Sequence, residues 1–254
     1  MLNGKHLVVV MPAYNAAQTL KQTWDEIPHD YVDDVILVDD CSVDTTVEVA
    51  ENLGITTIIQ AANRGYGANQ KRCYKEALRL GADVIIMLHP DYQYSPRLIL
   101  TMATLVLSGH YDVALGSRIL GGHSLSNGMP FYKYFSNRVL TLIQNLSLGA
   151  KLSEYHTGYR AFSREVLETL PLEENSDDFV FDNEMLLQCL FFNFQIGEIS
   201  CPTRYFPTSS NISFRRSVKY GFGVLITTSR YLVSKYLNVN VAIFNQNGRR
   251  LNKD

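Results

Sequence analysis

Residues 7–15 read LVVVMPAYN, an unbroken apolar run that gives way to a short polar segment. An apolar run without alternating polar residues is typical of a strand that is covered on both faces of a sheet. We expect a strand over residues 7–11 and a helix over residues 16–26, with Asn15 as the helix N-cap and Pro28 marking its end. This stretch predicts a strand–helix unit in which polar residues directly follow the strand.

The same alternation continues along the first part of the chain. Further strands are expected over residues 35–38, 55–59, 84–88 and 111–115, and further helices over residues 45–53, 68–80 and 96–107. Repeated units of this kind predict an α/β fold with a mostly parallel central sheet flanked by helices. In such sheets ligands bind at the carboxyl ends of the strands.

The second part of the chain is less regular. After a loop over residues 116–130 that is rich in Gly, Ser and Asn, we expect helices over residues 132–148 and 183–192. An extended segment is expected over residues 196–206, and a polar, frayed tail over residues 245–254. No long linker rich in Pro, Gly or Ser interrupts the sequence, so we expect a single domain.

Composition limits the classes of function. The 254 residues are 46% hydrophobic and 19% charged, which is enough to build a full core and argues against a disordered chain. The net charge of −2 gives no overall basic field, so we expect no nucleic-acid partner. The four cysteines form no CxxC pair and are expected to be reduced thiols: Cys41, Cys73, Cys189 and Cys201.

The apolar runs of the sequence are short. The run near the N-terminus is too short for the apolar region of a signal peptide. No window reaches the ~20 apolar residues that a helix needs to cross a bilayer. We therefore expect a cytoplasmic protein without a transmembrane helix.

Two adjacent carboxylates, Asp39 and Asp40, follow the second predicted strand. Crowding two negative charges at a strand end is unfavourable unless hydrogen-bond donors or a positive charge meet them. We expect a carboxylate at this position to accept hydrogen bonds from a nucleobase or a ribose. Ser42 or Asp44, a few residues later, is expected to cap the following helix.

A third carboxylate, Asp91, follows the fourth predicted strand in the segment LHPDYQYSP. A carboxylate in this position suits a hard divalent cation that bridges diphosphate oxygens. If the segment is extended, His89, Asp91 and Gln93 point to the same side and face one metal ion. The alternative is that Asp91 only caps a turn before Pro96.

At this point the sequence resembles the family 2 glycosyltransferases of the GT-A fold, and within them the polyprenyl-phosphate (dolichyl-phosphate mannose synthase-like) branch. The resemblance runs from about residue 8 to about residue 225. It is carried by the order and spacing of short stretches, namely PAYN (12–15), VDDCSVDTT (38–46), NRGYG (63–67), HPDYQYSP (89–96), GSR (116–118) and HTGYR (156–160).

The resemblance implies a nucleoside-diphosphate sugar donor, with UDP or GDP as the nucleotide, and a divalent cation, Mn²⁺ or Mg²⁺. In the donor half, about residues 1–118, the implied nucleotide-sugar site comprises Pro12, Ala13, Tyr14, Asn15, Asp39, Asp40, Asn63, Arg64, Gly65, Pro90 and Asp91. Asp91 matches the second acid of the family's DxD metal motif, and Gln93 matches a further metal-side residue. His89 stands where the family usually has the first aspartate, and imidazole suits Mn²⁺ better than Mg²⁺.

The turn Gly65-Tyr66-Gly67 lacks the third glycine of a dinucleotide fingerprint and follows the third predicted strand, not the first. We interpret it as a flexible turn that opens the next helix. Arg64 beside it either lends charge to the diphosphate or is an ordinary solvated arginine. Arg118 matches a basic residue that meets phosphate charge in the family.

The acceptor half is expected over about residues 119–213. Transfer with inversion needs in-line attack, and a hydroxyl acceptor needs a general base, whereas an ionised phosphate does not. Asp182 and Glu184 are the candidate bases, with helix capping as the alternative for Asp182. The resemblance places basic residues that match Arg138 and the region after Ser209-Ser210 near the acceptor phosphate. The full predicted acceptor set is Arg138, Thr157, Gly158, Arg160 and Arg215.

Residues 214–237 mix basic and apolar side chains and predict an amphipathic helix. Such a helix either lies on the inner face of a membrane as a peripheral contact, packs on the domain, or joins two copies in a homo-oligomer. Residues 1–240 are expected to form the glycosyltransferase domain, followed by a polar tail over residues 241–254.

Three functions remain after this reading of the sequence. The first is inverting transfer of a sugar to a polyprenyl phosphate. The second is transfer to a saccharide hydroxyl during assembly of a cell-envelope polysaccharide. The third is a non-catalytic nucleotide-sugar binder, which the unusual His89 keeps open. The lack of a glycine-rich turn after the first strand disfavours a dehydrogenase and a sugar-nucleotide pyrophosphorylase.

Overall fold

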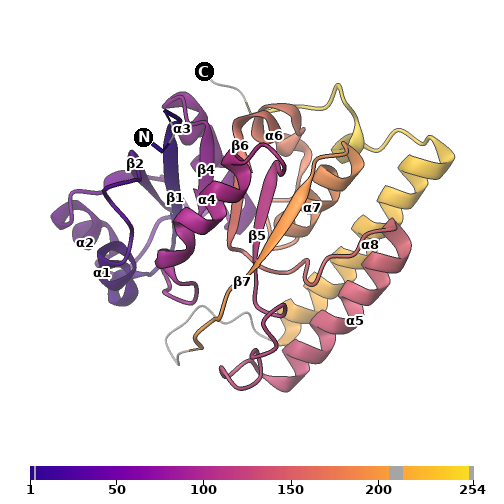
Figure 1. Ribbon diagram of the computed structural model, residues 1–254, viewed down its shortest axis with the longest axis horizontal. Coiled ribbons are helices and arrows are strands. Elements are labelled where there is room, and N and C mark those ends of the chain that lie inside the picture. Colours follow the sequence, from indigo (N-terminus) through magenta and orange to yellow (C-terminus); the bar gives the residue numbers. More distant parts are fainter. Residues whose placement is uncertain (3, 206–213, 252–254) are drawn as a thin grey trace.

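The computed structural model describes residues 1–2, 4–205 and 214–251. Within them a seven-stranded sheet has the order β3-β2-β1-β4-β6-β5-β7 (Figure 1). The strands are β1 (Leu7–Ala13), β2 (Asp34–Asp39), β3 (Thr56–Ile59), β4 (Val84–Met87), β5 (Val113–Ser117), β6 (Arg160–Ser163) and β7 (Ile196–Ser200).

Strand β6 is the antiparallel member of an otherwise parallel sheet. It pairs antiparallel with both of its neighbours, β4 and β5, whereas β1, β2, β3 and β4 pair in parallel, as do β5 and β7. The start of β6 therefore lies at the edge of the sheet where its neighbours end. Chain segments from both halves of the sequence meet there.

Most helices of the described residues flank this sheet, while α5 and α8 pack on each other and α8 packs on α7 (Figure 1). They are α1 (Ala17–Asp25), α2 (Thr46–Asn52), α3 (Tyr66–Arg79), α4 (Ile99–Leu107), α5 (Phe131–Leu148), α6 (Arg164–Thr169), α7 (Phe181–Phe191) and α8 (Phe214–Leu237). Short 3-10 turns are η1 (Pro96–Leu98), η2 (Leu172–Glu174) and η3 (Ala242–Phe244).

Alternate residues of the strands serve two separate cores. In β1, Leu7, Val9 and Met11 face the core under α1, α2 and α4, while Val8 and Val10 face the core under α3, α6 and α7. This alternation follows from the two-residue period of a strand. Because both faces are covered, every position of β1 is buried and the strand is apolar almost throughout.

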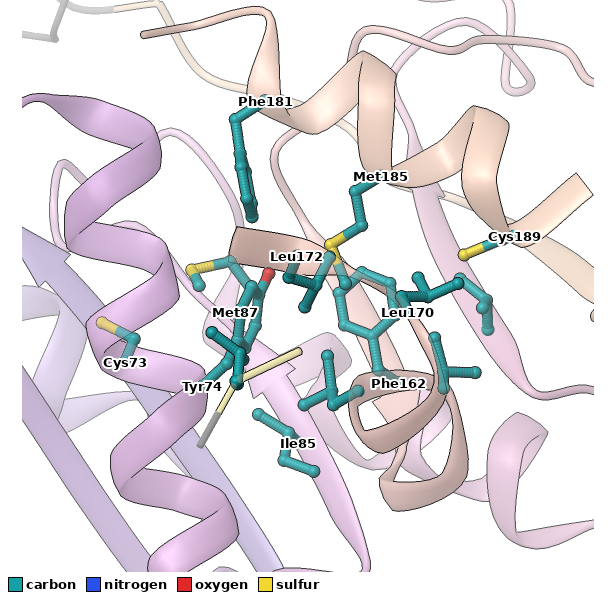
Figure 2. Packing of buried hydrophobic residues seen from close by; sticks show 14 of the residues in the cluster. Cys73, Tyr74, Ile85, Met87, Phe162, Leu170, Leu172, Phe181, Met185 and Cys189 are labelled. Atoms are coloured by element: carbon teal, nitrogen blue, oxygen red, sulfur yellow. The ribbon is translucent and has the colours of Figure 1, made fainter. Parts of the chain in front are cut away.

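The core under α3 and α7 is closed by aromatic and sulfur-containing side chains (Figure 2). Tyr74 on α3 meets Phe162 on β6 edge-on, with ring centroids 5.6 Å apart, and stacks on Phe181 of α7 at 6.4 Å. Edge-on and offset ring pairs add stability beyond the area that they bury. These contacts fix α3 against the start of α7, and both helices carry residues of the candidate site.

The predicted fold class is confirmed: the chain has a mostly parallel sheet flanked by helices, and a C-terminal helix, α8, over the predicted residues. Strand β6 was not predicted, because four residues within a polar, aromatic segment carry too little periodicity. The extended segment predicted over residues 196–206 is a strand only to Ser200, and residue 206 lies outside the described residues.

Two local predictions were wrong. Asn15 is not the N-cap of α1, since Ala16 occupies that position and Asn15 has a φ of 53°. The tail is not frayed over residues 245–251, because Leu251 is buried in the core and Arg249 pairs with Glu174 at 2.9 Å. Ile243 and Phe244 of η3 are buried with it, so apolar side chains anchor this segment. Residues 252–254 lie outside the description.

Candidate active site

The carboxyl ends of β1, β2 and β4 meet at one edge of the sheet. The Asp40 N–H donates to the Ala13 carbonyl at 2.9 Å, and the Leu88 N–H donates to the Val10 carbonyl at 3.0 Å. From α3, the Asn69 amide donates to the Val38 carbonyl at 3.0 Å. The residues predicted for the nucleotide-sugar site that follow these strands therefore lie together, as the sheet topology requires.

Asp39 and Asp40 are both buried, and separate sets of donors meet their charges. Asp39 accepts hydrogen bonds from the Ser42 N–H at 2.9 Å and from the Ser42 hydroxyl at 2.5 Å. Asp40 accepts from the backbone N–H groups of Arg64 and Gly65, at 2.8 and 3.0 Å. These internal donors explain how two adjacent carboxylates are tolerated.

Asn15 and Asp44 tie the loop after β1 to the loop after β2. The Asn15 amide oxygen accepts from the Val43 N–H at 2.9 Å. Asp44 accepts from the N–H groups of Thr46 and Ala17, at 3.0 and 3.2 Å, so one carboxylate serves the first turns of both α1 and α2. Asp44 thus accepts from the first N–H of α2, although Thr45 occupies the N-cap position, and Ser42 bonds instead to Asp39 and to the Asn15 N–H.

Pro12 and Ala13 are buried within β1, whereas Tyr14 beside them is half exposed. Asn63 and Arg64 expose their side chains at the same edge of the sheet. The aromatic ring and the amide and guanidinium groups are thus presented to solvent above buried backbone. This surface is the part of the predicted nucleotide site that a ligand reaches without rearrangement of the core.

The turn at Gly65 and Gly67 is a packing junction and not a flexible loop. A Cβ added at Gly67 would lie 2.3 Å from the Ser176 carbonyl oxygen and 2.8 Å from the Cβ of Phe181. Gly65 has a φ of 96°, which favours glycine. The Gly67 N–H donates to the Asp177 carbonyl at 2.8 Å. The interpretation of this turn as flexible is therefore wrong.

The segment after β4 turns instead of staying extended. Tyr92 has a φ of 57°, and the Asp91 carboxylate accepts from the Gln93 N–H at 3.1 Å. The argument that alternation alone places His89, Asp91 and Gln93 on one side is therefore wrong. Burial raises the pKa of the Asp91 carboxyl, although the neighbouring His89 lowers it.

His89 belongs to a hydrogen-bonded chain that crosses from β4 to α7. Its Nε2 lies 3.0 Å from the Tyr66 hydroxyl, which in turn donates to Asp182 Oδ2 at 2.6 Å. Asp182 Oδ1 accepts from the Gln70 amide at 2.9 Å. Both oxygens of the predicted base Asp182 thus have partners from α3, and the residue lies in the first turn of α7.

Arg118 follows β5 and is paired with a carboxylate. It donates its backbone N–H and its Nε to Glu154, each at 2.8 Å, and its Nη2 also reaches Glu154 and, at 2.9 Å, the His156 carbonyl. Burial alone would raise the pKa of Glu154, but the charge and hydrogen bonds of Arg118 lower it. A phosphate that reaches Arg118 would share it with Glu154.

The predicted acceptor residues at 157–160 pack between the two sides of the site. The Thr157 hydroxyl donates to the Gly116 carbonyl at 2.7 Å, and the Gly158 N–H donates to the Tyr94 hydroxyl at 3.1 Å. Arg160 is fully buried, and its guanidinium donates to the backbone carbonyls of Thr157, Asp182 and Tyr155. This geometry gives Arg160 a structural role instead of the predicted direct contact with the acceptor.

The other acceptor-side predictions are more scattered. Glu184 is buried and accepts from the Ser176 N–H at 2.7 Å, and burial raises its pKa. Arg138 is exposed on α5 and donates to the Ser153 carbonyl at 2.9 Å. Arg215 is exposed on α8. The region around Ser209-Ser210 lies outside the described residues.

The side chains around Asp91 suit a divalent cation only if a bound phosphate and water supply the remaining ligands. Among residues 1–2, 4–205 and 214–251, no three His, Cys, Asp or Glu side chains are grouped so that they could hold a metal. Cations in phosphate-transfer sites often take one or two carboxylates from the protein and the remaining oxygens from substrate phosphates and water. A carboxylate, an amide and an imidazole from residues 89–93 suit that arrangement.

Comparison with known proteins identifies the family. The sequence model described as "Glycosyl transferase family 2" matches residues 8–170, well over half of the chain. The chain belongs to glycosyltransferase family 2. This confirms the resemblance on which the site residues were assigned.

Two curated relatives of this glycosyltransferase carry a dolichyl phosphate or a polyprenol monophosphomannose in their names. The UDP-N-acetylglucosamine–dolichyl-phosphate N-acetylglucosaminyltransferase of Methanococcus voltae is 25% identical, over 92% of this chain and 99% of its own length. The polyprenol monophosphomannose synthase of Mycolicibacterium smegmatis is 24% identical, over 76% of this chain and 75% of its own length.

Solved structures confirm the GT-A fold. Glucosyl-3-phosphoglycerate synthase from Mycobacterium tuberculosis, in complex with UDP, has a TM-score of 0.72 at 19% identity, covering 91% of this chain and 81% of its own. Other structures of that enzyme hold UDP together with Mn²⁺ or with Mg²⁺.

Three residues of the glycosyltransferase site were not singled out from the sequence. Tyr66 and His156 were included only as members of the stretches NRGYG (63–67) and HTGYR (156–160), without a role of their own, and Glu154 was not included in any of the stretches that carry the resemblance. His156 donates to or accepts from the Tyr220 hydroxyl at 2.8 Å through Nδ1, and burial lowers its pKa to about 4. The one sequence signal that could have found Glu154 and His156 is that both are polar residues beside an aromatic residue, Tyr155.

Proposed function

We propose that this glycosyltransferase moves a sugar from a nucleoside-diphosphate sugar, with UDP or GDP as the nucleotide, to a polyprenyl phosphate, with inversion at the anomeric carbon. The observation that carries the proposal is the position of residues 156–158. This segment touches His89 through Gly158 and Arg118 through the His156 carbonyl. The imidazole of a proposed metal ligand and a cation suited to phosphate therefore flank the same short segment.

The donor would lie over the edge formed by Tyr14, Asn15, Asp40 and Arg64. A divalent cation, Mn²⁺ or Mg²⁺, would be held by Asp91 with Gln93 and His89, and it would offset the charge of the departing nucleoside diphosphate. The complexes of the fold relative with UDP and either metal support this part of the proposal. Arg64 is exposed near the same edge and can add positive charge toward the diphosphate.

A phosphate acceptor is favoured over a saccharide hydroxyl by the state of the two candidate bases. Both oxygens of Asp182 accept hydrogen bonds from α3 side chains. Glu184 is 4% exposed and accepts from a backbone N–H. A hydroxyl acceptor needs a free base within hydrogen-bond reach, whereas an ionised phosphate oxygen attacks without one. Attack forms the new C–O bond as the bond to the diphosphate breaks.

Helices α5 and α8 support contact with a membrane surface. They pack against each other (Figure 1), and neither contains an aspartate or a glutamate. Their basic residues are Lys133, Arg138, Arg215, Arg216, Lys219, Arg230 and Lys235. Since the whole chain carries −2, the positive charge is concentrated here. Of the described helices, none is long and apolar enough to cross a membrane.

The outer side of α8 adds apolar surface to this charge. Val224 and Tyr231 point into the domain and are buried, whereas Phe222 and Ile226 are 63% and 52% exposed. On α5, Phe135 and Leu146 are 59% and 77% exposed. Basic helices with an exposed apolar face bind anionic bilayers at the headgroup level. We infer that α5 and α8 rest on an anionic membrane, where a polyprenyl phosphate is also held.

The transfer reaction itself tests the proposal. The purified protein is incubated with UDP- and GDP-sugars, with and without Mn²⁺, and with either a polyprenyl phosphate or free saccharides. Metal-dependent transfer to the polyprenyl phosphate alone is expected. Transfer to saccharides would favour polysaccharide assembly. Donor binding in a thermal-shift assay without any turnover would instead favour a nucleotide-sugar binder.

A further inference from the structure

The chain of contacts from His89 to Asp182 determines where protons lie. The Tyr66 hydroxyl is 3.0 Å from His89 Nε2 and 2.6 Å from Asp182 Oδ2. Asp182 is held in turn by Gln70, whose amide oxygen accepts from the Tyr74 hydroxyl at 3.0 Å. Tyr66, Gln70 and Tyr74 all come from α3, so one rigid helix face fixes the Asp182 carboxylate.

The Tyr66 hydroxyl has one hydrogen to give. A tyrosine hydroxyl keeps its proton at neutral pH, because its ordinary pKa is about 10. The Tyr66 hydroxyl donates this hydrogen to Asp182 Oδ2 across the short contact of 2.6 Å. The Tyr66 oxygen can then only accept in its 3.0 Å contact with His89, so the hydrogen of this bond must come from His89 Nε2–H.

The packing of the imidazole points the same way. A Cβ added at Gly158 would lie 2.5 Å from His89 Nε2 and 2.9 Å from its Cδ2. This edge of the ring is therefore enclosed by Gly158 and Tyr66, with the Tyr66 ring stacked at 5.5 Å. Nδ1 lies on the opposite edge of the imidazole ring.

We propose that Tyr66 and Asp182 are positioning residues that hold His89 as its Nε2–H tautomer, which leaves Nδ1 free to bind the divalent cation beside Asp91. The inference rests on the proposed function, because that function supplies the cation. It also gives Asp182 a role other than that of a general base. A metal-bound histidine commonly donates the N–H of its second ring nitrogen to an outer acceptor, which fixes the tautomer. In this protein the acceptor is the Tyr66 oxygen, and Asp182 holds Tyr66 in place.

The first test needs no metal and no activity. ¹⁵N NMR of the metal-free protein at about pH 8, where an ordinary imidazole is neutral, is expected to show the His89 proton on Nε2. His89→Gln assigns the signal. Tyr66→Phe is expected to give a mixture of the two tautomers, since the acceptor for Nε2–H is gone. A wild-type imidazole that carries its proton on Nδ1 would overturn the inference.

The second test measures Mn²⁺ affinity in the presence of UDP or GDP, whichever stabilises the protein. Loss of the outer partner is expected to weaken Mn²⁺ binding by ~10- to 100-fold in Tyr66→Phe. Tyr155→Phe is the matched control, because the hydroxyl of this buried tyrosine donates to Asn145 at 2.9 Å and not to His89. Pulsed EPR of bound Mn²⁺ is expected to show a coupled imidazole nitrogen that disappears in His89→Gln.

The outcomes separate the two proposals. Wild-type protein that binds nucleotide but no Mn²⁺ would contradict the metal dependence in the proposed function. The NMR measurement on the metal-free protein would still decide whether Tyr66 holds the Nε2–H tautomer of His89. Mn²⁺ bound without a nitrogen coupling, or with equal affinity in Tyr66→Phe and wild type, would refute the positioning role and leave the proposed function standing.

Discussion

The carboxylate of Glu154 accepts hydrogen bonds from both the backbone N–H and the guanidinium of Arg118. The contact from the backbone N–H and the contact from Nε are each 2.8 Å long, and Glu154 is fully buried. The Asn137 amide from α5 adds a fourth donor, after three from Arg118, at 2.7 Å. This arrangement ties the end of β5 to the segment that leads into residues 156–160. Arg118, which we propose to meet phosphate charge, is therefore also part of the fold.

Removal of Glu154 is expected to destabilise the protein strongly. Glu154→Ala leaves the Arg118 charge buried without its partner, which costs about 3–5 kcal/mol in comparable cases. Urea unfolding at neutral pH measures the loss. The control is Glu51→Ala, an exposed helix position where a change within about 0.5 kcal/mol is expected. A similar effect for both variants would show that the pair contributes little.

The same pair predicts a specific dependence on pH. The pKa of Glu154 is lower in the folded protein than its ordinary 4.5, so the unfolded chain takes up the proton first as pH falls. The stabilisation is complete above about 4.5 and is lost as pH falls through the lower folded value. The stability gap between wild type and Glu154→Gln should therefore shrink below about pH 4.5. A gap that stays constant down to about pH 3 would argue against this linkage.

Asp91→Asn is expected to abolish most of the transfer activity while the fold is kept. The change removes the carboxylate proposed to hold the cation, and such a cation contributes several kcal/mol to a reaction of this type. This corresponds to a loss of at least ~100-fold in kcat/KM. Asp30→Asn, at an exposed turn, serves as control and should keep full activity. Undiminished turnover in Asp91→Asn would remove Asp91 from the metal site.

Much of the fold and the donor edge could be predicted from local sequence. Buried parallel strands read as apolar runs, and polar residues after them must lie at one edge, so the positions of Asp39, Asp40 and Asp91 followed from β1, β2 and β4 alone. Helix α8 was predicted to its ends because a long helix accumulates a clear amphipathic pattern.

The tertiary partners of these residues could not be predicted. Glu154 is 36 residues from Arg118, and Asp182 is 116 residues from Tyr66. No periodicity links positions that far apart. Strand β6, which brings residues 156–160 to the edge, is only four residues long. The burial of Arg160 and the turn at Tyr92 also depend on neighbours from other elements, which local patterns do not encode.

Gly67 should tolerate no side chain. In Gly67→Ala the new Cβ would meet the Ser176 carbonyl and Phe181, neither of which can yield without shifting backbone. We expect a loss of about 1–3 kcal/mol by overpacking. Gly221→Ala is the matched control in α8, where the nearest atom to the new Cβ is 4.0 Å away, and it should be neutral or stabilising by up to about 1 kcal/mol. Thermal unfolding of both variants makes the comparison, and equal melting temperatures would contradict the packing argument.

Membrane binding through α8 is expected to depend on both charge and apolar surface. The double change Phe222→Ser and Ile226→Ser removes two exposed side chains whose full burial would contribute about 1.5–3 kcal/mol each. Binding to vesicles of phosphatidylglycerol and phosphatidylcholine should fall at least ~10-fold. It should also weaken with added salt and be minimal on pure phosphatidylcholine, because exposed charges are screened.

Tyr31→Ser is the control for this measurement. It removes an exposed aromatic ring from the loop between α1 and β2, close to the start of β1 and away from the carboxyl edge of the sheet. Equal vesicle binding by wild type and the α8 variant would exclude this face as the membrane contact. If the α8 changes instead convert a dimer into a monomer in analytical ultracentrifugation, the face joins two copies of the chain. In that case the exposed apolar residues of α8 are explained by self-association, and the lipid acceptor must reach Arg118 from another side.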